Sequence, residues 1–258
     1  MHEEKAHAEP INDVDDALLE RLESRADPAR RKLVRKFANA TLRRRPHAQS
    51  TAADLDAVAD RLVEAFEFFD ARRLGEIAIR VANHAMPTSG HPEPCTVVEV
   101  AIEDRPFLLS TATEELRRLG HEVVHVLHPV IGVVRDDDGR LVDVVPARGA
   151  TKREALLHLE LDTPIPHEEH DELRRCVRAV LEDVIVVIRD ESHMREKVER
   201  FAVELRARAT TGEPNEEALE AAALLEWLLD DNFLPLGWRE YEIVEDDDGP
   251  QARGAAVN

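Results

Sequence analysis

The sequence predicts an α+β fold in which an antiparallel sheet carries helices on one face. Residues 96–102 alternate as a strand does, with Val98, Val100 and Ile102 on one side. A helical repeat follows in residues 106–119 and a stronger one in 168–189. Runs rich in β-branched residues lie between these helices and predict two or three more strands. A helix that follows a strand needs a sheet to pack against, so helices over one face are the natural architecture.

The segment before this sheet predicts a disordered tail and then helices. Residues 1–12 are charged and aperiodic, whereas 13–93 are interpreted as a helical leader that ends in a linker. Asp27 is placed to cap a helix with Pro28 at its first position, and Thr51 opens another helix as a capping box with Asp54. Gly75 is a suitable stop, and the three prolines of residues 86–94 are typical of a linker.

The sheet-forming domain is expected to span 94–190. Pro106 suits the first turn of its first helix, Glu114 and Arg118 are spaced as an outer ion pair, and Gly120 ends the helix. Residues 122–134 predict one long strand, a turn at 136–139 leads into a strand at 141–145, and 155–162 predict another. The positions expected to face the core are Leu108, Leu109, Ala112, Leu116, Leu119, Leu157, Leu159, Leu161, Leu173, Val177, Val180, Val184 and Ile188.

Behind this domain the sequence predicts a helical connector over 191–232. One helix is expected at 192–209, and Glu213 with Pro214 begins another that ends near Asn232. Residues 233–244 then predict a strand, and nothing after it is patterned to pair with it. We therefore interpret 233–258 as the start of an incomplete next module with a polar tail. The chain is then expected to be a fragment, a truncated gene product or one part of a split polypeptide.

Composition excludes several classes of protein. The 34 basic and 54 acidic residues give a net charge of −20, which opposes binding to a nucleic-acid backbone. No run approaches the ~18 apolar residues that a membrane span requires, and the N-terminus has no apolar signal segment. The two cysteines, Cys95 and Cys176, are interpreted as small core residues and make no disulfide framework. The chain is expected to be cytoplasmic, with no nucleic-acid or membrane partner.

Motifs that carry catalysis are missing from the sequence. None of the ten glycines forms a G-x-G-x-x-G or Walker-type turn, and no G-x-S-x-G elbow occurs, so no catalytic residue and no bound cofactor are assigned to this chain. His167 and His170 flank two glutamates but lie three residues apart, whereas a metalloprotease helix needs four; a solvated helix start is expected, and no metal site. The Asp136–Gly139 run is interpreted as a hairpin turn.

Three basic clusters lie within a helical pattern of apolar residues, at residues 30–32, 35–36 and 43–45. Such clusters can contact phosphate, but we favour a helix with a charged outer face.

Several motifs resemble known proteins. Glu103–Leu109, between a strand and a helix, resembles the start of an ACT domain, a small βαββαβ regulatory module. A wider set of motifs is similar to the N-terminal region of the large bacterial NAD-dependent glutamate dehydrogenases and follows that family's order. These motifs are Thr96–Val100, Pro106–Leu109, His128–Val130, Arg135–Arg140, His158–Asp162 and Asp230–Tyr241.

The resemblance implies a role as well as a fold. Those enzymes convert L-glutamate, NAD and water to 2-oxoglutarate, ammonia and NADH, and they carry a long non-catalytic N-terminal half of ACT-type and PAS-type modules. The chain is then expected to be a regulatory and assembly segment, with NAD bound elsewhere in the parent enzyme. Its expected partners are further copies of itself through ACT-type sheet or helix contacts, the remaining domains of that enzyme, and a small amino-acid effector. The alternatives are a stand-alone ACT-like module that binds an amino acid, or a free-standing enzyme.

The candidate effector site is the turn before the first helix of the sheet domain. Helix N-termini present backbone amides to carboxylates, although the same residues are expected simply to start a helix. Amino-acid-binding ACT loops often carry glycine where this chain has Phe107. The residues of this candidate site are Asp104, Arg105, Pro106, Phe107 and Ser110.

Other residues of the family-like motifs are expected to be structural. His128 and His158 are expected on neighbouring strands as hydrogen-bonded sheet residues, in preference to a metal pair; Pro129, Asp231 and Asn232 complete the set. The last strand of the βαββαβ order is not found after the helix at 168–189. Either the strand at 141–145 or a neighbouring module is expected to complete the sheet.

Overall fold

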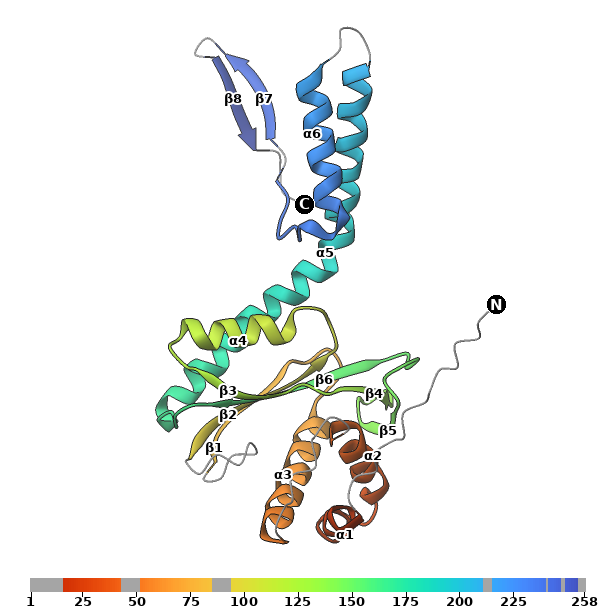
Figure 1. Cartoon of the computed structure of the whole chain (residues 1–258), viewed down its shortest axis with the longest axis vertical. Helices are drawn as coiled ribbons and strands as arrows, with labels where there is room; N and C mark the ends of the chain where they lie inside the picture. The colour runs from red at the N-terminus through yellow and green to blue at the C-terminus, as the bar shows by residue number, and fades with distance from the viewer. Residues whose placement is uncertain are drawn as a thin grey trace, which may run out of the picture. The chain divides into compact units, whose positions relative to one another are not determined.

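The computed structural model describes residues 16–42, 52–84, 94–210, 215–239, 241–246 and 249–254 (Figure 1). The chain divides into two units, the first ending at Leu181 and the second beginning at Glu182. The first unit is α+β and consistent with an ACT-like fold, as predicted, and the second combines helices with a β-hairpin. Thr51 and the 43–45 basic cluster lie outside the described residues.

The first unit is built on a six-stranded antiparallel sheet in the order β1-β2-β6-β4-β5, with β3 also paired to β6. Its two central strands, β2 and β6, are buried along almost their whole length. The strands are β1 (Ala78–His84), β2 (Cys95–Glu103), β3 (Val123–Leu127), β4 (Val130–Arg135), β5 (Leu141–Val145) and β6 (Arg153–Leu161).

Strand β1 lies in the leader, where the sequence predicts helix, so that prediction is wrong over 78–84. It pairs antiparallel with β2 over its full length, with Val81 opposite Val98. This is the place that the last strand takes in a βαββαβ sheet, beside the first. The sheet is therefore completed from its N-terminal side, and neither the strand at 141–145 nor another module is needed to complete it.

A side-chain network fixes β1 against the core of the unit. Thr96 Oγ1 donates to Asn83 Oδ1 at 2.6 Å and accepts from the Ile165 amide at 2.7 Å. The Asn83 side-chain amide closes the loop by donating to the Ile165 carbonyl at 2.9 Å. The network ties β1, β2 and the segment before the last helix of the unit together.

One face of the sheet carries the helices that the sequence predicts. Helix α4 (Leu108–Arg118) and the first part of α5 (His170–Thr210) lie on this side (Figure 1). The strand alternation is confirmed, because Val98 pairs with Leu159 and Val100 with Leu157 across β2 and β6. These residues are fully buried, as are Leu108, Ala112, Leu116, Leu173, Val177 and Leu181.

The opposite face is covered by the leader helices, which sequence patterning did not place there. These are α1 (Asp16–Arg25), α2 (Arg31–Leu42) and α3 (Ala52–Ala71), drawn below the sheet in Figure 1. Their core holds Phe37, whose ring lies 5.3 Å from Phe69 and 5.6 Å from Phe66. It continues into the sheet through Ala101, Ile131, Val133, Leu141, Val144 and Leu156.

The long strand predicted over 122–134 is in fact two strands. The break falls at His128 and Pro129, because proline has no amide hydrogen for the ladder. Both pieces still pair with β6. Gly132 then allows β4 to approach β5, since a Cβ there would lie 2.7 Å from the Val145 carbonyl oxygen.

Helix starts and ion pairs differ from prediction by a few residues. α4 begins at Leu108, not at Pro106, because Phe107 has a left-handed backbone (φ 68°) that no helix can include. Glu114 pairs with Arg117 and Glu115 with Arg118, so the predicted Glu114–Arg118 pair is wrong. α2 begins three residues after Pro28. Gly120 does end α4, with φ 90°.

The predicted helices at 168–189 and 192–209 are one continuous helix, α5. Its middle residues, Arg189 to Ser192, include no glycine or proline and give no reason to stop. A second helix, α6 (Glu216–Trp227), is capped by Asn215, whose side chain accepts from the Ala218 amide at 3.1 Å. A short π-helical turn, η2 (Leu228–Asn232), follows.

The strand predicted over 233–244 is confirmed only over 241–244, and the prediction that it has no partner is wrong. Residues 233–239 are irregular, and the strand is β7 (Tyr241–Asp246), which pairs antiparallel with β8 (Gly249–Gly254). The tail residues that sequence reasoning left as polar coil supply the partner. This strand therefore gives no evidence of an unfinished module.

Candidate functional site

The predicted effector turn lies between β2 and α4. Its first part is tied to β6, because the Asp104 amide donates to the Arg153 carbonyl at 2.9 Å and the Asp104 carboxylate lies 3.3 Å from the Arg153 guanidinium. Arg105 pairs with Glu103 at 3.2 Å. Phe107 is half exposed and has the positive φ that glycine adopts most easily. The turn therefore keeps a glycine-like backbone with a bulky side chain on it.

The start of α4 leaves backbone amides for another acceptor. No side chain caps the helix, and Ser110 Oγ donates to the Phe107 carbonyl at 3.0 Å instead of turning back to an amide. The first amides of a helix have no acceptor within the helix, and they attract carboxylates. The predicted site residues are thus brought together around the start of α4.

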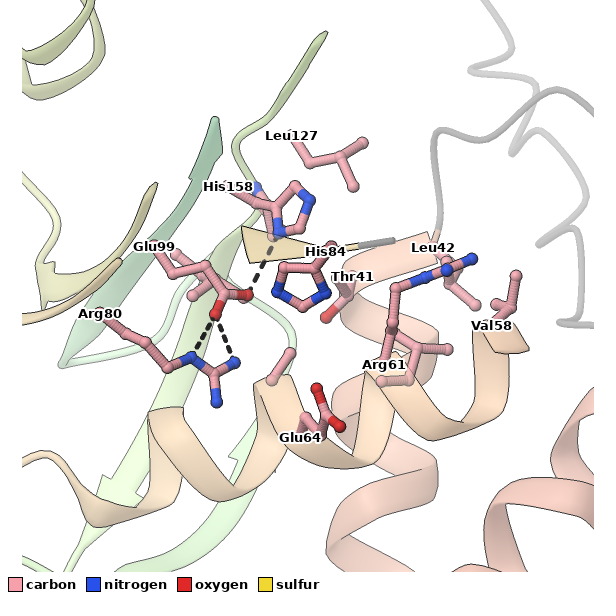
Figure 2. Close-up of a pocket in the computed structure, with 14 residues that line it drawn as sticks. Thr41, Leu42, Val58, Arg61, Glu64, Arg80, His84, Glu99, Leu127 and His158 are labelled. Atoms are coloured by element: carbon pink, nitrogen blue, oxygen red, sulfur yellow. Dashed lines mark hydrogen bonds and ion pairs between the residues drawn. The ribbon is translucent and has the colours of Figure 1, made fainter. Parts of the chain in front are cut away.

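A second cluster, which sequence reasoning missed, crosses the leader-facing side of the sheet (Figure 2). Arg80, Glu99 and His158 stand side by side on β1, β2 and β6, because Arg80 is opposite Glu99 and Glu99 opposite His158 in register. Arg80 Nε donates to Glu99 Oε2 at 2.7 Å. His158 Nδ1 lies 3.1 Å from Glu99 Oε1, and its Nε2 lies 3.3 Å from Glu160 Oε1.

This geometry fixes the protonation of the cluster. Carboxylates only accept, so a histidine between two of them needs a hydrogen on each ring nitrogen. Burial disfavours charged His158, but the hydrogen bonds and charges of Glu160 and Glu99 outweigh it and raise the pKa of His158. Burial likewise opposes ionised Glu99, yet the bond and charge of His158 and the charge of Arg80 hold its pKa below the ordinary value. The cluster is an alternating row of charges.

A cavity lies between this cluster and helices α2 and α3. Figure 2 shows His84 beside Glu99 and His158, with Arg61 and Glu64 of α3 opposite. Burial lowers the pKa of His84. The cavity has a volume of about 50 Å³, which suits a few water molecules and not a metabolite. Arg80, which lines this cavity, also lies over the Phe68 ring of α3 at 5.0 Å, so it contacts a leader helix as well as the sheet.

The remaining predicted residues are spread over both units. His128 lies with Pro129 in the break that follows β3. In the sheet register His158 pairs with Leu127, so His128 is one residue beyond the partner of His158. Asn232 donates to the carbonyls of Trp227 and Asp230 at 2.9 and 3.0 Å and so ends the π-helical turn. The side chain of Asp231 lies outside the described residues.

The two cysteines and His170 are held in different environments. Burial raises the pKa of Cys95 to about 11, so it stays a thiol. Cys176 is partly exposed, with Sγ 3.6 Å from Glu172 Oε1, so its assignment to the core is wrong. His170 is buried and bonds to the Ile165 carbonyl, whereas a solvated helix start was expected. Within the described ranges, no three His, Cys, Asp or Glu side chains gather as metal ligands, and no helix is long and apolar enough to cross a bilayer.

A third cluster, also missed, joins the end of α3 to the sheet. Arg135 is fully buried, and its Nε and Nη2 each donate to Glu154 at 2.8 Å. It also donates to the carbonyls of Phe69, Arg72 and Gly139 at 2.9, 3.0 and 2.9 Å. Arg72 Nη1 lies 2.7 Å from the same Glu154. The signal that marks both clusters in the sequence is a charged residue at an inward position of an apolar strand, as at 99 and 154.

Comparison with known proteins gives a consistent result. Residues 37–177 match the family model described as glutamate dehydrogenase, ACT1 domain. The chain is 30% identical to the NAD-specific glutamate dehydrogenase of Halomonas elongata over 89% of its own length and 14% of that protein. It is 32% identical to the enzyme of the same name from Pseudomonas aeruginosa over 66% of its length and 11% of that protein. The Mycobacterium tuberculosis protein of that name is 28% identical over 67% of the chain. No solved structure is significantly similar.

Proposed function

This chain belongs to the glutamate dehydrogenase ACT1 family, and on that premise we propose that it is a non-catalytic regulatory and assembly segment of a large NAD-specific glutamate dehydrogenase. The observation that carries the proposal is the match of residues 37–177 to that domain. The chain spans only 14% and 11% of its relatives in Halomonas and Pseudomonas, so most of such an enzyme lies outside it. The parent reaction would convert glutamate, NAD and water to 2-oxoglutarate, ammonia and NADH in the cytoplasm.

The structure supports a role in assembly. In the part of the chain that the structure describes, β1, β3 and β5 each pair with one strand only, so their outer edges are available to another subunit or domain. The Arg135 cluster joins the end of α3 to the sheet, and Arg80 of the Glu99 cluster lies over the Phe68 ring of α3 at 5.0 Å, so both clusters support the position of this leader helix. We propose that further copies of the chain and the remaining parent domains associate through these edges and helix faces.

We also propose the turn of Asp104, Arg105, Pro106, Phe107 and Ser110 as the place where an amino-acid effector binds. The uncapped start of α4 and the glycine-like backbone of Phe107 support it. NAD would be held by the parent enzyme and not by this segment.

Catalysis by the chain alone is tested by following NADH absorbance with glutamate and NAD present. We expect no NADH to form, and sustained turnover would contradict the proposal. Self-association is tested by sedimentation equilibrium over a range of concentrations; a monomer at all concentrations would contradict assembly through copies of this chain.

The effector turn is tested by thermal unfolding against the twenty amino acids, because a ligand that binds only the folded state raises its stability. Ser110→Asp places a negative charge in the first turn of α4, which favours the helix but repels a ligand carboxylate. Ser110→Asn is the matched control of similar size. We expect any stabilising amino acid to lose its effect in the aspartate variant only; equal shifts in both variants would exclude this turn.

A stand-alone amino-acid-binding module is the second candidate. The observation that favours it is that the sheet is completed within the chain by β1. It predicts the same thermal shift without association with other domains of a dehydrogenase.

A further inference from the structure

A groove on the first unit differs in chemistry from both sites above. It lies between the start of α2, the segment that follows α3 and the β4–β5 turn, and it encloses about 810 Å³. That volume falls within the range of small-molecule sites, ~300–1,000 Å³. The residues that line it are Arg30, Asp70, Ala71, Arg72, Arg73, Asp138, Gly139 and Arg140.

The groove is basic in a chain whose net charge is −20. Its four arginines and two aspartates leave two positive charges. The Arg30 side chain already has partners within the protein, because it pairs with Asp70 and donates to the Leu141 carbonyl at 3.1 Å. Arg73 and Arg140 are exposed, and neither guanidinium has an acceptor within the part of the chain that the structure describes. These two side chains are available to a ligand.

A buried excess of positive charge lies beneath the groove. Arg72 and Arg135 share one carboxylate, Glu154, and all three side chains are less than 5% exposed. The Nη1 atom of Arg72 lies 2.7 Å from Glu154 Oε1 but without the alignment of a hydrogen bond. The carboxylates of Glu76 and Asp136, which accept from the Arg73 and Arg140 amides, lie next to the lining and offset part of this positive charge.

The end of α3 would normally repel an anion here, because its last carbonyls carry partial negative charge. Arg135 removes this obstacle by donating to the Phe69 and Arg72 carbonyls. The end of α3 therefore does not repel an anion that binds in the groove.

Both free guanidinium groups stand on backbone that is held in place. The Arg73 amide donates to Glu76 Oε2 at 3.0 Å, and the Arg140 amide donates to Asp136 Oδ1 at 2.8 Å. Gly139, with φ 81°, packs so closely that a Cβ would lie 3.3 Å from the Leu74 amide nitrogen. Fixed walls reduce the entropy lost when a ligand is bound.

We propose that this groove binds the phosphate monoester group of a small metabolite or nucleotide, held between Arg73 and Arg140 over Arg72. A phosphate monoester carries about −1.5 to −2 charges at neutral pH, so it matches the two exposed guanidinium groups of Arg73 and Arg140 better than a single carboxylate does. A guanidinium group can also donate two parallel hydrogen bonds to two oxygens of one phosphate. The inference does not depend on the proposed function, since it uses only residues of the first unit.

The test is isothermal titration of the whole chain with AMP, inorganic phosphate and adenosine at fixed ionic strength set by sodium chloride. AMP is expected to bind and adenosine is not. If inorganic phosphate binds as tightly as AMP, the free anion is sufficient for binding. If AMP binds and inorganic phosphate does not, the ligand is a nucleotide. Both outcomes support a phosphate site in the groove. Binding of adenosine as tight as that of AMP, or no heat with either phosphate compound, would overturn the proposal.

Variants locate the binding. Arg73→Gln and Arg140→Gln are each expected to weaken AMP roughly tenfold, because each removes a charge-assisted bond. Asp138→Asn is expected to tighten it, since it removes a negative charge from the lining. Arg148→Gln is the matched control: Arg148 is an exposed arginine in the turn beyond the far end of β5. Equal weakening by the control, or full affinity in the Arg73→Gln/Arg140→Gln double variant, would place the ligand elsewhere.

Discussion

Removing the Arg135 side chain is expected to destabilise the first unit severely. Arg135→Ala leaves the buried Glu154 carboxylate with Arg72 alone and takes donors from the carbonyls of Phe69 and Gly139. Breaking a buried ion pair by removing one partner costs about 3–5 kcal/mol, and a lost hydrogen bond costs about 1 kcal/mol. The two lost hydrogen bonds add about 2 kcal/mol to the cost of the ion pair, so we expect a loss of about 5–7 kcal/mol, comparable with the whole stability of a small domain at about 5–15 kcal/mol.

The assay is urea unfolding followed by two probes. Both tryptophans, Trp227 and Trp238, belong to the second unit, so their fluorescence reports on that unit alone. Circular dichroism reports on both. In the Arg135→Ala variant the first unit should unfold at lower urea than in the native chain, as seen by circular dichroism. The midpoint of the fluorescence transition should not change.

Arg153→Ala is the control for that experiment. Arg153 is next to Glu154, and its side chain is 54% exposed in a surface pair with Asp104, so its removal should cost about 0–1 kcal/mol. A loss below about 1.5 kcal/mol in Arg135→Ala, or equal losses in the two variants, would refute the idea that this cluster holds leader and sheet together.

Four further outcomes follow from the geometry. Because the folded pKa of His158 is raised, its contribution to stability is complete below about pH 6.5 and is lost as pH rises through the folded value. Urea midpoints should therefore fall as pH rises above about 6.5 in the native chain but stay flat in His158→Gln, and a midpoint that rises would contradict this. The lowered pKa of Glu99 has the opposite sign, so its contribution is present above about pH 4.3 and is lost as pH falls through the folded value; an acid-side loss that persists undiminished in Glu99→Gln would speak against it. Phe107→Gly should be about 1 kcal/mol more stable than Phe107→Ala, because only glycine adopts a positive φ without strain; the reverse order in thermal unfolding would show that the turn is not left-handed. Gly132→Ala should cost about 1–3 kcal/mol by overpacking, since its Cβ would lie 2.7 and 2.8 Å from two carbonyl oxygens, whereas Gly237→Ala, with open space around it, should change the midpoint little.

Local patterns in the sequence predicted the centre of the fold well. Alternation identified β2 and the burial of Val98 and Val100, and the leucines of α4 and β6 were assigned to the correct faces. Gly120 and the Asp136–Gly139 turn were recognised because their backbone requirements are local. The resemblance to the dehydrogenase family was confirmed by the family match.

The errors arose where partners are distant in the chain. β1 is short, and its sequence, Ala78–His84, does not differ enough from a helical pattern to show that it pairs with β2. β8 contains glycine and proline, which disfavour a strand until β7 provides a ladder.

The charged clusters were missed for a related reason. Arg135, Arg72 and Glu154 come from three separate segments, and only the fold shows that they share one buried site. The basic cluster at Arg30 was interpreted as a solvated helix face, whereas Arg30 borders the groove beside Arg73 and Arg140.

The completion of the sheet by a strand of the leader is tested most directly by hydrogen exchange of the whole chain, read by mass spectrometry. β1 pairs with β2 along its full length, so the amides of 78–84 should exchange as slowly as those of 95–103 and lose protection together with them in urea. Exchange of 78–84 at the rate of an unstructured peptide, while 95–103 stay protected, would contradict this fold and with it the self-contained ACT-type unit proposed for the chain.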